Sequence, residues 1–281
     1  MVGTALQIKQ SEPFLRRDWR RMTWLSLALA VVPVLSCSFI VLTPEGCVAQ
    51  TESADLTKGI VAPALVVGFM GGFVRSDDLR HSEVQIARQI QRTYGARVLV
   101  RMFENREKAQ ALSLVLEWLS SAEYERRTEQ EKSDPPIILF GHSWGASAVV
   151  SLARELERRD IPVSLTIQVD SVRKKGEDDS VIPPNVAEAI NFYQPGGMLR
   201  GRSTITAADP SRTRILGNFR FQYEKEPAEC RSYPWYDRLL FKGHTAIECD
   251  PRVWSQIEAM IKVRLPEVLP APQAVIATRV P

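Results

Sequence analysis

A short glycine and serine pattern is the clearest sign of chemistry in this chain. It reads Gly141-His142-Ser143-Trp144-Gly145 and follows an apolar run of strand length, Ile137 to Phe140. Apolar residues then recur three or four positions apart, which is typical of one face of a helix. A strand that turns sharply into a helix presents the serine hydroxyl as a nucleophile, and glycines leave room for so tight a turn. We therefore expect nucleophilic chemistry at Ser143.

The same five residues resemble the nucleophile elbow of the α/β-hydrolase superfamily, which includes esterases and lipases. The resemblance covers residues 60 to 264 and is to the superfamily as a whole. It implies an α/β fold with a mainly parallel, doubly wound sheet. It also implies a catalytic triad in the chain order serine, acid, histidine, and acyl transfer that needs no metal and no organic cofactor.

The base of such a triad would be His244. The chain has three histidines. His81 precedes the serine, which breaks the order of the superfamily, and we expect the side chain of His142 to point away from that of Ser143. His244 lies in a Gly-His-Thr segment that we expect to be a loop before the last helix, where the superfamily places its base.

Two aspartates compete for the role of the acid. Asp170 ends the strand that follows the helix after Ser143, whereas Asp209 ends a later predicted strand, after which the superfamily more commonly places its acid. We choose Asp170, because its strand is the clearer of the two and because an acid one strand earlier occurs in some lipases that this chain resembles. Asp209, followed by Pro210, would then start a turn.

Backbone N–H groups are expected to stabilise the oxyanion of the tetrahedral intermediate. One donor would be Trp144, directly after the nucleophile. The other would come from the glycine-rich segment after the first strand, Gly68-Phe69-Met70-Gly71-Gly72, with Phe69 as our choice and Met70 as the alternative. The His-Gly-Gly-Gly form of this segment is absent.

Alternating strands and helices predict a parallel sheet and place the site at the carboxyl ends of its strands. Apolar runs indicate strands at residues 62–68, 97–103, 137–140, 163–169, 203–208 and 215–223. Periodic apolar residues indicate helices at residues 82–94, 106–126, 146–156, 184–193 and 251–264. Ser82 is the expected N-cap of the first helix, Asp250 and Pro251 open the last one, and residues 224–243 are expected to be irregular.

The N-terminal residues 1–49 are typical of an export signal or a membrane anchor. Residues 9–22 are basic and residues 23–42 carry no charge, so that a helix rising about 1.5 Å per residue would just cross a bilayer of about 30 Å. Arginines before an apolar run predict export to the cell envelope, the periplasm or beyond. Cleavage after Ala49, a lipoprotein signal at Cys37 and a retained anchor are alternatives, so membrane association through residues 23–42 stays open.

We expect residues 50–60 to be a linker, residues 61–264 to be the hydrolase domain and residues 265–281 to be a disordered tail. Cleavage after Ala49 would leave two cysteines, Cys230 and Cys249. Disulfides persist in exported proteins, so this pair is expected to close a loop of about 20 residues and to contribute about 3 kcal/mol. Two buried free thiols are the alternative.

Composition limits the classes of function. The formal net charge is only +3, with no basic stripe, and gives no support to nucleic-acid binding. No spacing of cysteines and histidines typical of a metal site is present. We therefore expect a serine hydrolase that cleaves the ester bond of a small-molecule acyl ester. A thioesterase or peptidase on the same fold, or a non-catalytic envelope binding protein, is the alternative, and the oligomeric state and a lid are left open.

Overall fold

The computed structural model describes residues 64–121, 136–223, 228 and 230–265. The predicted export signal or anchor, the linker and most of the predicted tail lie outside these residues. Leu265 is the exception, because it is buried in the core and is therefore not part of a disordered tail. None of the helices in the described segments combines the length and the apolar character required to cross a membrane.

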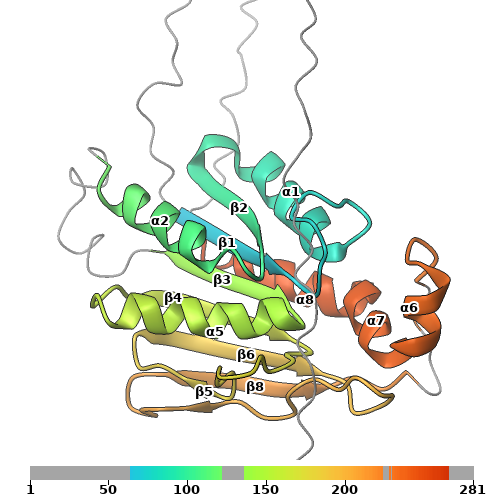
Figure 1. Cartoon of the computed structure of the whole chain (residues 1–281). Coiled ribbons are helices and arrows are strands. Elements are labelled where there is room, and N and C mark those ends of the chain that lie inside the picture. The colour runs from blue at the N-terminus through green and yellow to red at the C-terminus, as the bar shows by residue number, and fades with distance from the viewer. Residues whose placement is uncertain (1–63, 122–135, 224–227, 229, 266–281) are drawn as a thin grey trace, which may run out of the picture. The chain divides into compact units, whose positions relative to one another are not determined.

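Six parallel strands form the central sheet, in the order β2-β1-β3-β4-β6-β8 (Figure 1). The strands are β1 Ala64–Met70, β2 Val98–Glu104, β3 Ile137–His142, β4 Val163–Val169, β6 Val186–Tyr193 and β8 Arg214–Arg220. Every residue of β1 and β3 is buried, which explains why these two strands are so rich in apolar residues. The register pairs Phe69 with Gly141 and His142 with Val169, so the carboxyl ends of β1, β3 and β4 lie together.

Helices cover both faces of this sheet, as expected for a doubly wound fold (Figure 1). One face carries α1 Ser82–Tyr94 and α8 Pro251–Lys262, and the other carries α2 Lys108–Leu119 and α5 Trp144–Glu157. A short 3-10 helix, Gly95–Arg97, ends α1. Two more helices, α6 Trp235–Leu240 and α7 Lys242–Cys249, precede α8.

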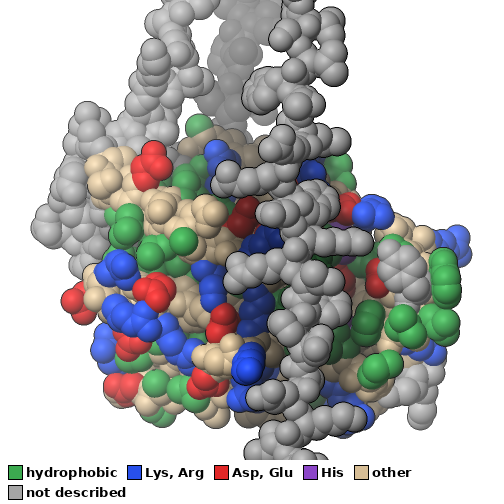
Figure 2. Space-filling model, in the orientation of Figure 1, with side chains coloured by type: hydrophobic (Ala, Val, Ile, Leu, Met, Phe, Trp, Pro, Cys, Tyr) green, Lys and Arg blue, Asp and Glu red, His purple; other side chains and the backbone are tan. Residues whose placement is uncertain are grey.

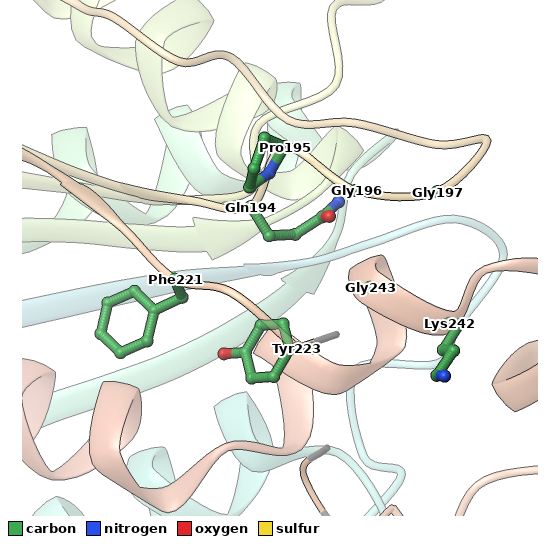
Figure 3. A pocket seen from close by; sticks show the side chains of 8 residues that line it. All are labelled: Gln194, Pro195, Gly196, Gly197, Phe221, Tyr223, Lys242 and Gly243. Carbon is green, nitrogen blue, oxygen red and sulfur yellow. The ribbon is translucent and has the colours of Figure 1, made fainter. Parts of the chain in front are cut away.

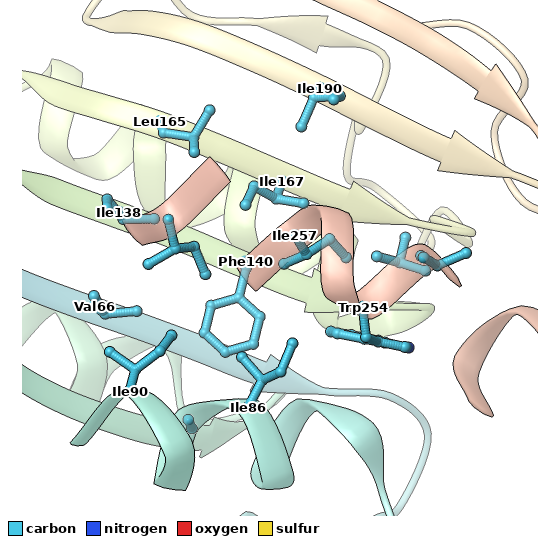
Figure 4. Packing of buried hydrophobic residues seen from close by; sticks show 14 of the residues in the cluster. Val66, Ile86, Ile90, Ile138, Phe140, Leu165, Ile167, Ile190, Trp254 and Ile257 are labelled. Carbon is cyan, nitrogen blue, oxygen red and sulfur yellow. The ribbon is translucent and has the colours of Figure 1, made fainter. Parts of the chain in front are cut away.

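The core has two halves because successive strand residues point to opposite faces of the sheet. Phe140 of β3 belongs to the half under α1 and α8, where Figure 4 shows its ring near Ile86 and Trp254. Leu139, the residue before it, belongs to the half under α2 and α5. All four side chains are at least 95% buried. Burying each such side chain contributes about 1.5–3 kcal/mol, and together they hold the elbow at the end of β3 in place.

The predicted helix at residues 184–193 is wrong, because this segment forms strand β6. Its apolar residues Val186, Ala189 and Ile190 have a spacing that also suits a helix. The deciding factor is tertiary: β6 pairs with β4 on one side and with β8 on the other, and most of its residues are buried. Pairing with its two neighbouring strands therefore outweighs the helix-compatible spacing of the apolar residues in β6.

Three other predictions need correction. The predicted strand 203–208 shrinks to β7 Thr206–Ala207, which pairs with β5 Val181–Ile182 in a separate two-stranded sheet. The region expected to be irregular contains α6 and the start of α7, so His244 lies in a helix and not in a loop. Ser82 is the first residue of α1 and not its N-cap, because the His81 carbonyl already accepts from the Gln85 N–H.

The start of α8 agrees with its sequence. Asp250 caps the helix by accepting a hydrogen bond of 2.8 Å from the Arg252 N–H, and Pro251 follows at the first position. At the far side of the sheet, β8 is an edge strand with an irregular register opposite Ala189 and Ile190. Most of its residues are only partly buried or exposed.

Candidate active site

The turn between β3 and α5 has the geometry of a nucleophile elbow. Ser143 occupies it with φ 57° and ψ −124°, a conformation that costs a non-glycine residue about 1–3 kcal/mol. A Cβ on Gly141 would lie 2.6 Å from the backbone of Gly145, and one on Gly145 would lie 2.2 Å from the Phe69 carbonyl oxygen. Only glycine therefore fits at either position, as the sequence pattern predicts.

Backbone hydrogen bonds lock this turn to the end of β4. The Ser143 N–H donates to the Val169 carbonyl at 2.9 Å, and the Ser143 carbonyl accepts from the Val172 N–H at 3.2 Å. Asp170 follows Val169 directly, with a φ of 45° that turns the chain away from the strand. The serine and the candidate acid are thus fixed to each other through main-chain bonds.

Asp170 and His244 form a buried pair. His244 Nδ1–H donates to Asp170 Oδ2 at 2.6 Å, and the Asp170 side chain is completely buried. This bond joins residues 74 positions apart and fixes the orientation of the imidazole ring. It leaves Nε2 as the ring nitrogen available to a nucleophile.

The Asp170 carboxylate also accepts three hydrogen bonds from the segment after β6. The donors are the Gln194 N–H at 3.1 Å, Gln194 Nε2 at 2.9 Å and the Gly201 N–H at 2.9 Å. A Cβ on Gly201 would lie 2.1 Å from Asp170 Oδ1. Sequence reasoning missed Gln194 and Gly201, because Gln194 directly follows the segment predicted as a helix. A strand assignment for β6 would have placed Gln194 beside Asp170.

Asp209, the alternative acid, lies in a turn after β7. Its Oδ1 accepts from the N–H of Ser211 at 2.9 Å and from its hydroxyl at 2.6 Å. The hydrogen bonds from Ser211 also lower the pKa of Asp209. The residue therefore has the turn-forming role that the sequence suggests, and it is Asp170 that contacts His244.

The described residues contain no hydrogen bond to the Ser143 hydroxyl. Ser143 is 6% exposed and His244 is 7% exposed, so both residues are buried. Hydrogen bonds between nucleophile and base are often long before substrate binds. The structure thus brings acid and base together and places the nucleophile at the same end of the sheet.

The predicted oxyanion donors lie on either side of the elbow. Trp144 is the first residue of α5, where backbone N–H groups have no partner within the helix. Phe69 and Met70 are fully buried at the end of β1, and the Phe69 carbonyl touches the first turn of α5 at Gly145. The Phe69 side chain packs against Phe103, so it belongs to the core and does not line a substrate site.

An aromatic pair marks the surface beside the nucleophile. Phe73 is 87% exposed, and its ring and the Trp144 ring are nearly perpendicular, with centroids 5.6 Å apart. Lys174 Nζ lies 5.6 Å from the centroid of the Trp144 ring and donates to Asn105 Oδ1. Asn105 Nδ2 in turn donates to the Gly72 carbonyl at 2.5 Å, and this hydrogen bond fixes the loop that carries Phe73.

A small pocket lies next to residues that neighbour the acid–base pair (Figure 3). Its volume is about 90 Å³, and Gln194, Gly243 and Tyr223 are among its lining residues. Gln194 supports Asp170, and Gly243 precedes His244, but Ser143 does not line the pocket. It is large enough for a few water molecules.

A second buried polar cluster lies behind the base. The rings of His142 and His244 are 4.5 Å apart between centroids, and His142 Nδ1 lies 3.6 Å from carboxylate oxygens of both Glu83 and Glu248. Glu248 also accepts from His81. Burial, together with the Glu248 carboxylate, raises the pKa of Glu83 well above its usual value, and burial lowers the pKa of His142 to about 4. His81, Glu83 and Glu248 offer ligand atoms that all lie within 4.8 Å of one another, so they could hold a metal ion.

Helix α7, which carries His244, ends at a disulfide, and the preceding helix α6 exposes apolar side chains. Cys230 and Cys249 are joined, with Cα atoms 5.6 Å apart, and Cys249 is the last residue of α7. On α6, Trp235, Leu239 and Leu240 are 68%, 69% and 50% exposed. Figure 2 shows hydrophobic side chains gathered on the side of the molecule where α6 lies.

Comparison with known proteins gives likenesses at low identity. Neither a protein-family model nor a curated protein matches the sequence. The RedJ thioesterase of the prodiginine pathway in Streptomyces coelicolor is similar in structure, with 12% identity, 73% of this chain and 91% of that chain covered and a TM-score of 0.37. YbtT, a type II thioesterase of the yersiniabactin pathway, has 12% identity, coverages of 73% and 95% and a TM-score of 0.38. A YdeN-like hydrolase from Pectobacterium atrosepticum has 13% identity, with 75% of this chain and 97% of that chain covered and a TM-score of 0.35.

Proposed function

We propose that this protein is a serine hydrolase that cleaves a carboxylic ester through an acyl-enzyme. The observation that carries the proposal is the buried Asp170–His244 pair, joined at 2.6 Å, beside a serine in the strained conformation of a nucleophile elbow. A histidine held by a buried carboxylate and a serine at the head of a helix are the parts that acyl transfer requires.

In the first half of the reaction, Ser143 Oγ attacks the carbonyl carbon and its proton passes to His244 Nε2. Asp170 holds the Nδ1–H tautomer and stabilises the imidazolium that forms. The Trp144 N–H donates to the oxyanion at the start of α5, where the helix dipole favours negative charge. The Phe69 N–H is the proposed second donor, with the Met70 N–H as the alternative.

The second half returns the enzyme to its resting state. His244 donates its proton to the departing alcohol oxygen, which breaks the ester bond and leaves the acyl group on Ser143. His244 then takes a proton from water, which attacks the acyl carbon, and the acid leaves as Ser143 regains its proton. The residues themselves supply every proton transfer in this scheme.

The surroundings favour an ester with an apolar acyl or alcohol group. Phe73 exposes most of its ring directly beside Trp144 and hence beside the nucleophile. An exposed aromatic ring of this kind contributes contact area for an apolar ligand. The disulfide between Cys230 and Cys249 supports the proposal that the protein works in an oxidising compartment such as the cell envelope.

A fluorophosphonate probe tests the proposal on the full chain. We expect the wild-type protein to be labelled, and labelling to be lost in Ser143→Ala and to slow by at least about 10³-fold in His244→Ala. Asp209→Asn is the matched control for Asp170→Asn: only the Asp170 variant should lose activity. Circular dichroism establishes that each variant is folded.

A panel of esters, thioesters and peptides with the same acyl group then identifies the bond that is cleaved. Higher kcat/KM for the thioester or the peptide would replace the esterase proposal with a thioesterase or a peptidase. A folded wild-type protein that takes no label would favour a binding protein on this fold. Labelling that survives Ser143→Ala would refute the assigned nucleophile.

A further inference from the structure

Four polar side chains meet behind the catalytic base and are not used by the proposed mechanism. His81 precedes α1 and Glu83 lies in its first turn, His142 ends β3, and Glu248 lies on α7. Each residue is at least 91% buried. The cluster therefore joins three parts of the fold that are far apart in the sequence.

The contacts within the cluster leave polar atoms without partners. Within the described part of the chain, neither oxygen of the Glu83 carboxylate has a hydrogen-bond partner, although the side chain is completely buried, and His142 Nε2 has none either. Glu248 accepts from His81, and carboxylate oxygens of Glu248 and Glu83 lie within 4.8 Å of each other. Two buried carboxylates this close need either a proton or a cation between them.

We propose that His81, Glu83, His142 and Glu248 bind a divalent metal ion of the zinc type. Ligand atoms of His81, Glu83 and Glu248 lie within 4.8 Å of one another, and His142 Nδ1 is 3.6 Å from oxygens of both glutamates. Four ligands at about 2.0–2.2 Å from zinc are separated by about 3.4 Å in a tetrahedron. Zinc coordination would therefore require the widest of these separations to shorten by up to about 1.4 Å and the hydrogen-bonded atoms of His81 and Glu248 to move apart.

The donor set favours zinc over magnesium or calcium. Two imidazole nitrogens and two carboxylate oxygens suit zinc, whereas magnesium and calcium prefer oxygen ligands only. Two ionised carboxylates and two neutral imidazoles together carry two negative charges, which a divalent cation neutralises. Asp78 Oδ2 lies 3.9 Å from His81 Nε2, on the side where carboxylates commonly orient a ligating imidazole.

The buried position implies a structural ion. Four protein ligands leave no open position for a substrate. His142 contacts the ring of His244, and Glu248 lies one helical turn after His244 on α7. The ion would therefore hold the base and the elbow in a fixed relation, and its loss would loosen both.

Metal content of the full-length protein tests this proposal independently of activity. We expect the protein, purified without chelators, to hold about one equivalent of zinc by mass spectrometry of its metals. A strong chelator should remove the zinc and lower Tm by several degrees, and added zinc chloride should restore Tm. The Ser143→Ala protein should behave identically, so that failure of the hydrolase proposal would not affect this result.

Two variants separate a bound ion from a bound proton. With an ion, Glu83→Gln should lower zinc content at least ten-fold and lower Tm, while Glu155→Gln, an exposed glutamate on α5, should leave zinc content unchanged. With a proton in place of the ion, Glu83→Gln would match or exceed the wild-type Tm. That outcome, or a wild-type protein that neither retains zinc nor gains stability from it, would overturn the proposal.

Discussion

Replacing Gln194 by leucine tests whether the catalytic acid, Asp170, depends on the hydrogen bond from the Gln194 side chain. The amide of Gln194 donates to Asp170 Oδ2 and to the Leu199 carbonyl, both at 2.9 Å. Leucine has a similar size but no donor, so the buried Asp170 carboxylate keeps only three of its four hydrogen bonds. A hydrogen bond to a charged group contributes about 1.5–3 kcal/mol. We expect the free energy of unfolding at pH 7 to fall by about that amount.

The same change should lower activity, because it loosens the carboxylate that orients His244. A misplacement of about 1 Å costs about 10²-fold in rate, so we expect kcat for a model ester to fall by about 10- to 100-fold with little change in KM. Urea denaturation and steady-state kinetics measure the two effects.

Gln85→Leu is the matched control for this variant. Gln85 is an exposed residue on α1 whose amide donates one bond of 2.9 Å to the Leu79 carbonyl. Its replacement should change the free energy of unfolding by less than about 0.5 kcal/mol and leave the rate unaltered. If Gln194→Leu were as stable and as active as this control, the argument that Gln194 supports the acid would be wrong.

Three further changes have expected outcomes. Gly145→Ala should destabilise the protein by more than about 3 kcal/mol and abolish labelling of the serine, because the added Cβ meets the unyielding backbone of Phe69 at 2.2 Å; normal thermal unfolding would contradict this. Reducing the bond between Cys230 and Cys249 should lower the free energy of unfolding by about 3 kcal/mol, seen as a shift in the urea midpoint that a Cys230→Ser variant does not show on reduction. Phe73→Ala should leave Tm unchanged, since the ring is exposed, and lower kcat/KM for aryl or long-chain esters by about ten-fold; an equal effect on acetate esters would argue against an apolar contact.

Local patterns were enough to predict the elbow and the central strands. Gly141 and Gly145 bracket the serine because the turn itself excludes any Cβ there, and this constraint is visible in five consecutive residues. Asp170 could be chosen because a clear apolar strand ends directly before it. The parallel sheet and the helices on both of its faces follow from the alternation of strands and helices.

Features that depend on distant partners were not visible. β6 has a spacing compatible with a helix, and only its pairing with β4 and β8 decides the matter. Gln194 and Gly201 acquire their roles because they meet Asp170 across the sheet. The cluster that contains Glu83 and Glu248 combines residues too far apart in the sequence to form a recognisable motif.

The exposed edge of the sheet at β8 affects how the protein behaves at high concentration. An open edge strand can pair with another chain and begin aggregation. Here β8 starts at Arg214 and ends at Arg220, and both arginines are exposed. The register shift opposite Ala189 and Ile190 also makes the strand irregular. Like charges would face each other if two such edges met. We therefore expect the arginines at the two ends of β8, the edge strand opposite β2 in the sheet, to disfavour sheet-to-sheet association.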